Sequence, residues 1–108
     1  MKILILESNL LWSSRLKQSV AGFGHEPTVA LKVPESPECF DVAIVGLASE
    51  PMRAEIPKLV ALGVHVIGHA GHKDKELHAL GRELGCHELA TNGQITFKIG
   101  EMLEARSV

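Results

Sequence analysis

The run MKILIL at residues 1–6 is apolar almost throughout and ends abruptly at the polar residues 7–9. A second run, FDVAIV at residues 40–45, repeats this pattern and is ended by Gly46. Short apolar runs of this kind are typical of parallel strands that are buried on both faces. The two runs therefore predict the central strands of a parallel sheet, with Glu7 and Gly46 just beyond the strand ends.

Apolar residues recur at helical spacing after the first run. They are Trp12, Leu16, Val20 and Phe23. Ser8 or Asn9 is able to cap the start of such a helix, and Gly22 or Gly24 is able to end it. The chain is thus expected to pass from a strand directly into an amphipathic helix.

The segment between this helix and the second apolar run is short and contains three prolines. Residues 25–31 include β-branched side chains, but Pro27 has no N–H to donate to a strand ladder, so an edge strand is expected. Pro34 and Pro37 leave little room for a full helix before residue 40. The second helix is therefore predicted to be one short turn or absent.

Strand and helix patterns keep alternating through the rest of the chain. Residues 49–62 are expected to be helical in their latter part, with Pro57 in the first turn or at a kink. Strand patterns at residues 63–68 and 88–91 are each followed by a helix pattern. The last two helix patterns rest on Leu77, Leu80 and Leu84, and on Ile95, Ile99, Met102 and Leu103. Such alternation implies parallel pairing through right-handed crossovers, and hence an α/β sandwich of three layers.

The composition is that of one ordinary globular domain. The 108 residues are 45% apolar and 22% charged, and the formal net charge is −2. A single domain spanning residues 1–108 is expected. Basic residues are not in excess, so direct nucleic-acid binding is not expected. No segment is long and apolar enough for a membrane span. With two cysteines and no leader pattern, we expect a cytoplasmic protein whose thiols are reduced.

Several motifs resemble the response-regulator receiver domain. Receivers begin with KILIV and two acidic residues, and this chain has KILIL at residues 2–6 followed by Glu7. Receivers commonly close their first helix with LGHEV, which is similar to FGHEP at residues 23–27. The second apolar run and GCHELATN at residues 85–92 resemble the third and fifth receiver strands. The resemblance covers nearly the whole chain and implies a flavodoxin-like sheet with strand order 2-1-3-4-5.

Four positions depart from the receiver pattern where receivers carry out phosphoryl transfer. Ser8 replaces the second acidic residue, and Gly46 replaces the aspartate that accepts the phosphoryl group. His69 occupies the Thr or Ser position, and Asn92 occupies the lysine position. Glu7 alone would be a weak Mg²⁺ ligand, because this ion dehydrates reluctantly and usually takes several carboxylate and phosphate oxygens. The resemblance therefore implies a degenerate phosphorylation pocket, no cofactor and no enzymatic activity.

Ordinary structural roles are expected for the substituted residues. Ser8 is expected to cap the first helix and Asn92 the last one. Gly46 is expected to allow a tight turn after its strand. Glu7 is interpreted as a solvated acid that the dipole of the first helix favours.

A metal or small-ligand site is the main alternative. His69 and His72 fall where the fourth strand is expected to end, and open α/β sheets bind ligands at this edge. Together with Glu7 they offer donors that suit zinc or another transition metal. The more ordinary interpretation is a polar loop with solvated histidines.

The predicted function is a pseudo-receiver that binds another protein, or itself as a homodimer, without phosphorylation. On the last helix Phe97 lies about 160° from Ile95, counted at 100° per residue, and so faces away from the core. Glu101 and Glu104 share its side of the helix. In receivers the fourth helix, fifth strand and fifth helix form the usual partner face. The resemblance therefore implies that Phe97, Glu101 and Glu104 contact the partner.

Overall fold

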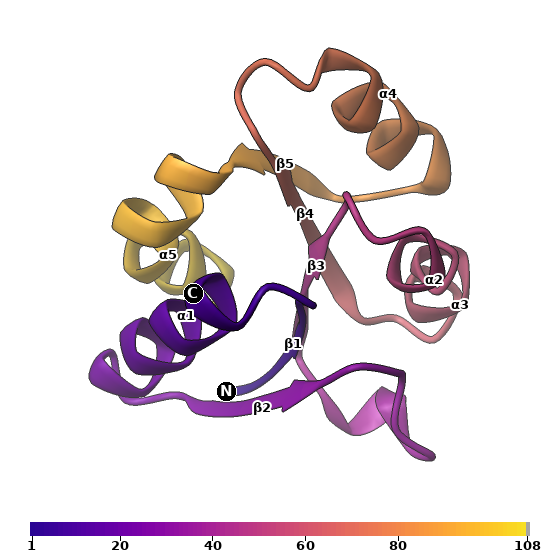
Figure 1. Cartoon of the computed structure of the whole chain (residues 1–108). Helices are drawn as coiled ribbons and strands as arrows, with labels where there is room; N and C mark the ends of the chain where they lie inside the picture. Colours follow the sequence, from indigo (N-terminus) through magenta and orange to yellow (C-terminus); the bar gives the residue numbers. More distant parts are fainter. Residues whose placement is uncertain (108) are drawn as a thin grey trace.

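The computed structural model describes residues 1–107, with side chains as far as residue 105, and contains a parallel sheet between two layers of helices (Figure 1). The five strands are β1 (Lys2–Leu6), β2 (Glu26–Ala30), β3 (Val42–Gly46), β4 (His65–Ala70) and β5 (Glu88–Thr91). Their order across the sheet is β2-β1-β3-β4-β5, and every neighbouring pair is parallel. The predicted α/β sandwich with strand order 2-1-3-4-5 is confirmed.

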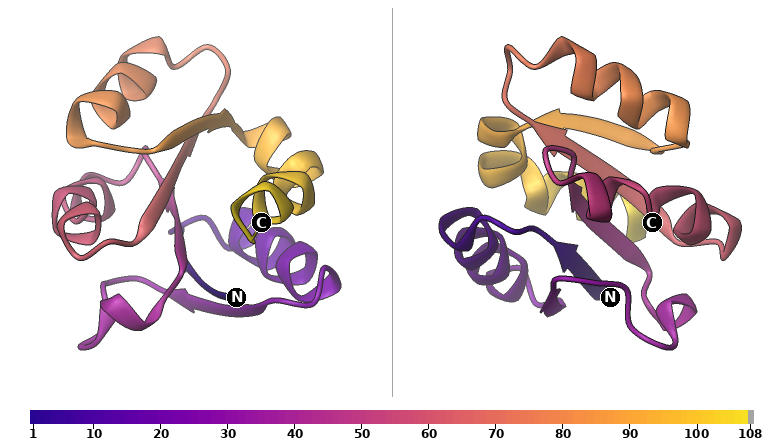
Figure 2. Two further views of the ribbon diagram at one scale, coloured as in Figure 1. Left: turned by 180° about the vertical axis from the view of Figure 1, so that it is seen from behind. Right: turned by 45° about the vertical axis from the view of Figure 1, so that its right-hand side comes forward.

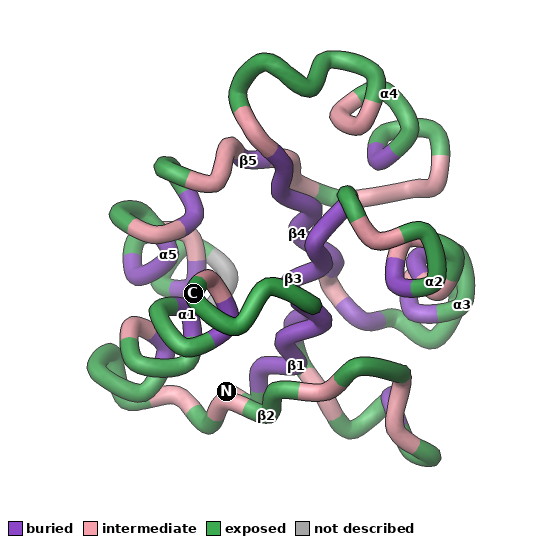
Figure 3. Tube along the Cα trace, viewed as in Figure 1, coloured by how far each residue is buried: buried purple, intermediate pink, exposed green. Residues whose placement is uncertain are grey.

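The helices divide between the two faces of the sheet (Figure 2). One face carries α1 (Leu10–Gly22) and α5 (Asn92–Ser107), and the other carries α2 (Glu50–Arg53), α3 (Ile56–Ala61) and α4 (Lys75–Leu84). Side chains that alternate along β1 explain the division, because Ile3 and Ile5 face α1 and α5 whereas Leu4 and Leu6 face the opposite layer. The central strands are therefore buried on both sides (Figure 3). None of the described helices is long and apolar enough to cross a membrane.

Side-chain caps begin the two helices of the first layer. Asn9 caps α1, because its side-chain oxygen accepts hydrogen bonds from the N–H groups of Leu11 and Trp12 at 2.9 and 3.2 Å. Thr91 and Gln94 form a reciprocal capping box at the start of α5, with distances of 2.9 and 3.0 Å. Both caps lie at the carboxyl edge of the sheet, next to the ends of β1 and β5.

The predictions that Ser8 caps α1 and that Asn92 caps α5 are therefore wrong. Ser8 is exposed and lies one residue before the N-cap position of α1. That position is held by Asn9, which already accepts hydrogen bonds from two N–H groups of the first turn. Asn92 is the first residue of α5, and its side chain is occupied by a contact with His69. The capping box leaves this amide available for that contact.

Two element boundaries differ from the sequence-based expectation. β4 continues to Ala70 instead of ending at Gly68, because its ladder with β5 extends through the pairs His69–Ala90 and Ala70–Thr91. Residues 49–62 form two short helices instead of one. Pro57 lies in the first turn of α3, as predicted, and has no N–H to bond the carbonyl of residue 53. The first of the two helices accordingly ends at Arg53.

The crossover from β2 to β3 has less regular secondary structure than the other described crossovers. Within the described chain it holds only the 3-10 helix η1 (Pro37–Cys39), so the predicted short second helix is confirmed. β2 is an edge strand, and the N–H of Glu26 bonds inward to the carbonyl of Met1 at 2.9 Å. The next residue, Pro27, therefore faces the open edge, where its missing N–H removes no ladder bond.

Candidate functional site

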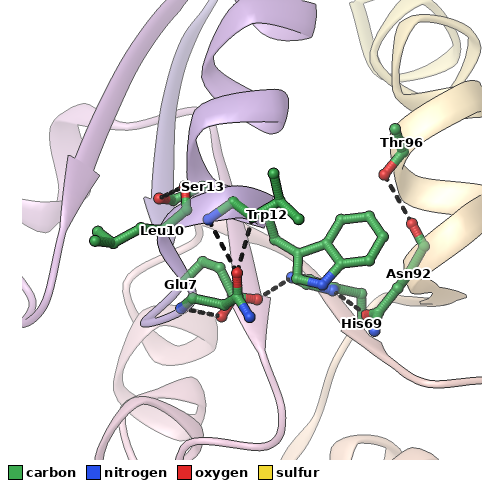
Figure 4. Close-up of polar contacts among 9 residues, drawn as sticks. Glu7, Leu10, Trp12, Ser13, His69, Asn92 and Thr96 are labelled. Atoms are coloured by element: carbon green, nitrogen blue, oxygen red, sulfur yellow. Dashed lines mark hydrogen bonds and ion pairs between the residues drawn. The ribbon is translucent and has the colours of Figure 1, made fainter.

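Glu7 is buried immediately after β1, with only 8% of its surface exposed. One carboxylate oxygen, Oε2, accepts a hydrogen bond from the backbone N–H of Asn9 at 3.0 Å. The other, Oε1, lies 3.0 Å from Nε2 of His69 on β4 (Figure 4). The expectation of a solvated acid at this position is wrong, because the side chain turns inward toward His69 instead of outward to water.

Gly46 makes room for this contact at the end of β3. A Cβ atom at this position would lie 2.5 Å from Oε1 of Glu7 and 3.0 Å from Oε2. Since β3 separates β1 from β4 in the sheet, the Glu7 side chain reaches His69 only by crossing the space that a side chain on residue 46 would fill. The expected turn follows Gly46, whose carbonyl accepts a hydrogen bond from the N–H of Ser49 at 3.3 Å, but Gly46 does not have a positive φ, so the turn itself does not require glycine. The glycine instead allows a close approach.

His69 lies between two oxygen atoms inside the protein, with 2% of its surface exposed. Its Nδ1 is 2.8 Å from the side-chain Oδ1 of Asn92, and Nε2 faces Glu7. Because Oδ1 of an amide only accepts hydrogen bonds, Nδ1 carries a proton. The Nε2 contact is close but is not aligned as a hydrogen bond. The expectation of a solvated histidine at this position is wrong.

The electrostatics of the site favour an ionised Glu7. Burial raises the pKa of Glu7, but the His69 contact and the backbone N–H of Asn9 outweigh burial, so the pKa is lowered below its ordinary value of 4.5. Each carboxylate oxygen of Glu7 thus faces a group that favours the ionised form of the acid.

These side chains border a small cavity of about 250 Å³ at the carboxyl edge of the sheet. Five of its lining residues are those of the expected degenerate pocket: Glu7, Ser8, Gly46, His69 and Asn92. The structure thus brings all five together around one space. They do not fit a Mg²⁺ site of the receiver type, because the buried carboxylate already has a partner at each oxygen and position 46 offers no ligand.

Comparison with known proteins places this arrangement in context. No family model and no curated protein matches the chain, whereas many solved structures do. A receiver domain protein from Methanospirillum hungatei matches with a TM-score of 0.74 at 20% identity, covering 98% of this chain and 95% of that one. The receiver domain of a DNA-binding response regulator from Colwellia psychrerythraea matches with a TM-score of 0.77 at 13% identity, covering 97% and 96%. This chain has the fold of a receiver domain.

One further structural match is a phosphorylated response regulator, and the remaining metal candidate of this chain, His72, lies outside the cavity. A response regulator from Burkholderia pseudomallei that carries a phosphorylated aspartic acid and a calcium ion matches with a TM-score of 0.73 at 13% identity, covering 99% of this chain and 72% of that one. In this chain the carboxyl edge of the sheet carries Glu7, Gly46 and His69. His72 is exposed and does not border the cavity. In the part of the chain that the structure describes, no three His, Cys, Asp or Glu side chains are grouped to hold a metal ion.

The proposed partner residues lie on α5, away from this cavity. Phe97 is 87% exposed, and Glu101 and Glu104 are exposed as well. The outward direction deduced from helical spacing is therefore confirmed for all three. Ile95 and Ile99 are fully buried on the opposite side of the same helix.

Two lining residues, Trp12 and Asp74, have no place in the sequence-based site. Trp12 is half-buried in the first turn of α1, with the Arg15 guanidinium 5.5 Å from its ring centroid. Asp74 precedes α4 and is exposed. Both residues follow closely after a strand that ends at the carboxyl edge. That position is the signal in the sequence that would have assigned them to the site.

Proposed function

We propose that this chain is a receiver-like signalling module that works without aspartyl phosphorylation, by binding another protein or a second copy of itself. The observation that carries the proposal is the position of Glu7. Its carboxylate occupies the space that the side chain of residue 46 would need, and Gly46 supplies no nucleophile. A pocket filled in this way has neither an acceptor nor room for one.

The chemistry of the site supports the same conclusion. Phosphoryl transfer to a carboxylate needs a free nucleophile and cations that neutralise the transferred oxygens. The Glu7 oxygens are instead held by His69 and by the N–H of Asn9. We therefore propose a module without catalytic activity of its own.

The proposal includes cytoplasmic residence of a single domain. Cys39 and Cys86 are both free, as expected in a reducing compartment. Burial raises the pKa of the Cys86 thiol to about 11, which keeps this group protonated and unreactive near neutral pH. The receiver fold accounts for the described chain from β1 to α5.

Exposure to a small-molecule phosphodonor tests the proposal directly. The purified protein is incubated with acetyl phosphate and Mg²⁺, and its intact mass is measured. We expect no added mass, because Gly46 supplies no acceptor and the Glu7 oxygens are held by His69 and the N–H of Asn9. A phosphorylatable receiver domain in the same mixture serves as the positive control for the reagents.

A labile gain equal to one phosphate group would contradict the proposal. The Glu7→Gln variant then identifies the acceptor, since Glu7 is the one acidic residue that is buried among the described side chains. Loss of the added mass in this variant would assign the phosphoryl group to Glu7 itself.

A further inference from the structure

The outward side of α5 carries an aromatic residue with acidic neighbours. Phe97 is the most exposed of the large apolar side chains in the described chain, at 87%. Glu101 follows it by four residues and therefore lies on the same side of the helix, where it is also exposed. A single exposed aromatic flanked by charge has the form of an anchor residue with a polar rim.

A groove lies on the other side of the molecule, beside edge strand β2. Its volume is about 800 Å³, and it is bordered by the loop after β2 together with α3. Four lining residues are apolar: Ala30, Leu31, Val33 and Pro34. Leu31 is 69% exposed, whereas Ala30 and Val33 pack against the core beneath α2, α3 and α4. The apolar side of the groove is thus continuous with the core.

The groove exists because one crossover lacks a full helix. Each of the other crossovers places at least one α-helix against the sheet, but the described β2-to-β3 crossover holds only η1. The figures show α3 and α4 along this face, and beyond β2 a loop with the short turn of η1 (Figures 1 and 2). A site of this kind has room for a helix that the chain does not supply there.

The charges around the groove favour an acidic helix. Lys32 and Lys58 border it together with one acid, Glu35, which gives a net charge of +1. The exposed side of α5 carries Glu101 and Glu104 on the side of Phe97, with Lys98 at its flank, which gives these three side chains a net charge of −1. Opposite charges across an interface steer the two surfaces together and fix their register.

An added strand is a poorer occupant than a helix. The open edge of β2 presents Pro27, which has no N–H to offer to a neighbouring strand. Strand addition at this edge would lack a ladder bond at that position. The structure therefore favours side-chain docking above β2 over pairing with its backbone.

We propose that the groove beside β2 receives α5 of a second copy of this chain, with Phe97 inserted next to Leu31 and Glu101 facing Lys32 or Lys58. This inference rests on the proposed interaction function and names the partner. The two surfaces lie on opposite faces of the sheet, so the contact is head-to-tail and not two-fold symmetric. A head-to-tail pair keeps a free groove on one copy and a free α5 surface on the other, so assemblies grow with concentration.

Sedimentation equilibrium over a wide concentration range tests the proposal, without any phosphodonor. We expect the weight-average mass of the wild type to rise past that of a dimer. Phe97→Glu and Leu31→Glu should each weaken association by roughly tenfold or more, since each removes one side of an anchor contact. Leu10→Glu, at an exposed apolar residue that begins α1, is the matched control and should associate like the wild type.

Mixing the two defective variants gives the sharper result. Phe97→Glu retains an intact groove, and Leu31→Glu retains an intact α5 surface, so an equimolar mixture should form a dimer that grows no further. Reversing charges provides an independent check. Lys32→Glu with Lys58→Glu should weaken association, and Glu101→Lys on the other member of a mixture should restore part of it.

Three outcomes would overturn the proposal. The first is a wild type that stays monomeric at the highest concentration reached. The second is wild-type association that both surface variants retain. The third is a mixture of the two variants that stays monomeric, which would indicate a symmetric contact or another partner. Circular dichroism of each variant shows that the fold is intact, and none of these results bears on whether the pocket accepts a phosphoryl group.

Discussion

Glu7 and His69 come from strands that are not neighbours, since β3 lies between β1 and β4. Their contact therefore depends on a third residue, Gly46, that takes no part in it. The sequence identified all three positions through the receiver resemblance but did not predict the contact. Whether the Glu7 side chain can pass the end of β3 depends on how close residues on three different strands lie in space. Patterns along the sequence do not give these distances.

Gly46→Ala is expected to destabilise the protein by about 1–3 kcal/mol, the usual cost of forcing an extra carbon into a packed interior. The added Cβ would lie 2.5 Å from Oε1 of Glu7, so the carboxylate must move away from His69. Urea denaturation of the variant and the wild type measures the difference.

Gly22→Ala is the matched control for this experiment. Gly22 ends α1, and a Cβ added there meets no atom within 4 Å. We expect this variant to be as stable as the wild type or slightly more stable, because alanine restricts the unfolded chain more than glycine does. Equal destabilisation by both substitutions would show that the space beside Glu7 is not the cause.

At the scale of elements, the order and type of helices and strands follow from the sequence, whereas the residues that cap them follow less well. Period and length separate buried strands from amphipathic helices along nearly the whole chain. Ser8 and Asn9 are both good capping residues, and propensity alone does not choose between them. The choice depends on which side-chain oxygen meets the first N–H groups of α1.

Asn9→Ala is expected to lower the free energy of unfolding by about 1 kcal/mol, because two N–H groups of α1 lose their acceptor. Ser8→Ala should change it by less than about 0.5 kcal/mol, as is usual for exposed positions without such a contact. Chemical denaturation of both variants under one set of conditions makes the comparison. A larger loss for Ser8→Ala would mean that the cap is assigned to the wrong residue.

At the scale of the whole molecule, the buried pair links folding to pH. The pKa of Glu7 is lowered in the folded protein, so its carboxylate binds protons less readily there than in the unfolded chain. The stability it contributes is present above the ordinary value of 4.5 and is lost as the pH falls through the lower, folded value. His69 then faces a neutral carboxyl group.

Comparison of Glu7→Gln with the wild type isolates this effect from that of the other carboxylates. Near neutral pH the variant should be less stable by about 1–3 kcal/mol, the usual cost of leaving a buried polar group without its partner. The difference should shrink as the pH falls below 4.5 toward the lower, folded pKa, because protonated Glu7 resembles glutamine. A stability difference that stays constant over this range would argue against an ionised Glu7. Urea midpoints measured at a series of pH values provide the test.

The tight fit between Gly46 and Glu7 constrains how such a domain evolves. A single change to aspartate at position 46 would not create a working acceptor, because the new carboxylate would collide with one that is already seated there. Glu7 would first have to be replaced by a shorter residue, and that change alone would leave the buried His69 without its carboxylate partner. Each of the two substitutions, at position 46 and at position 7, is therefore unfavourable without the other. An acceptor at position 46 would require both changes together.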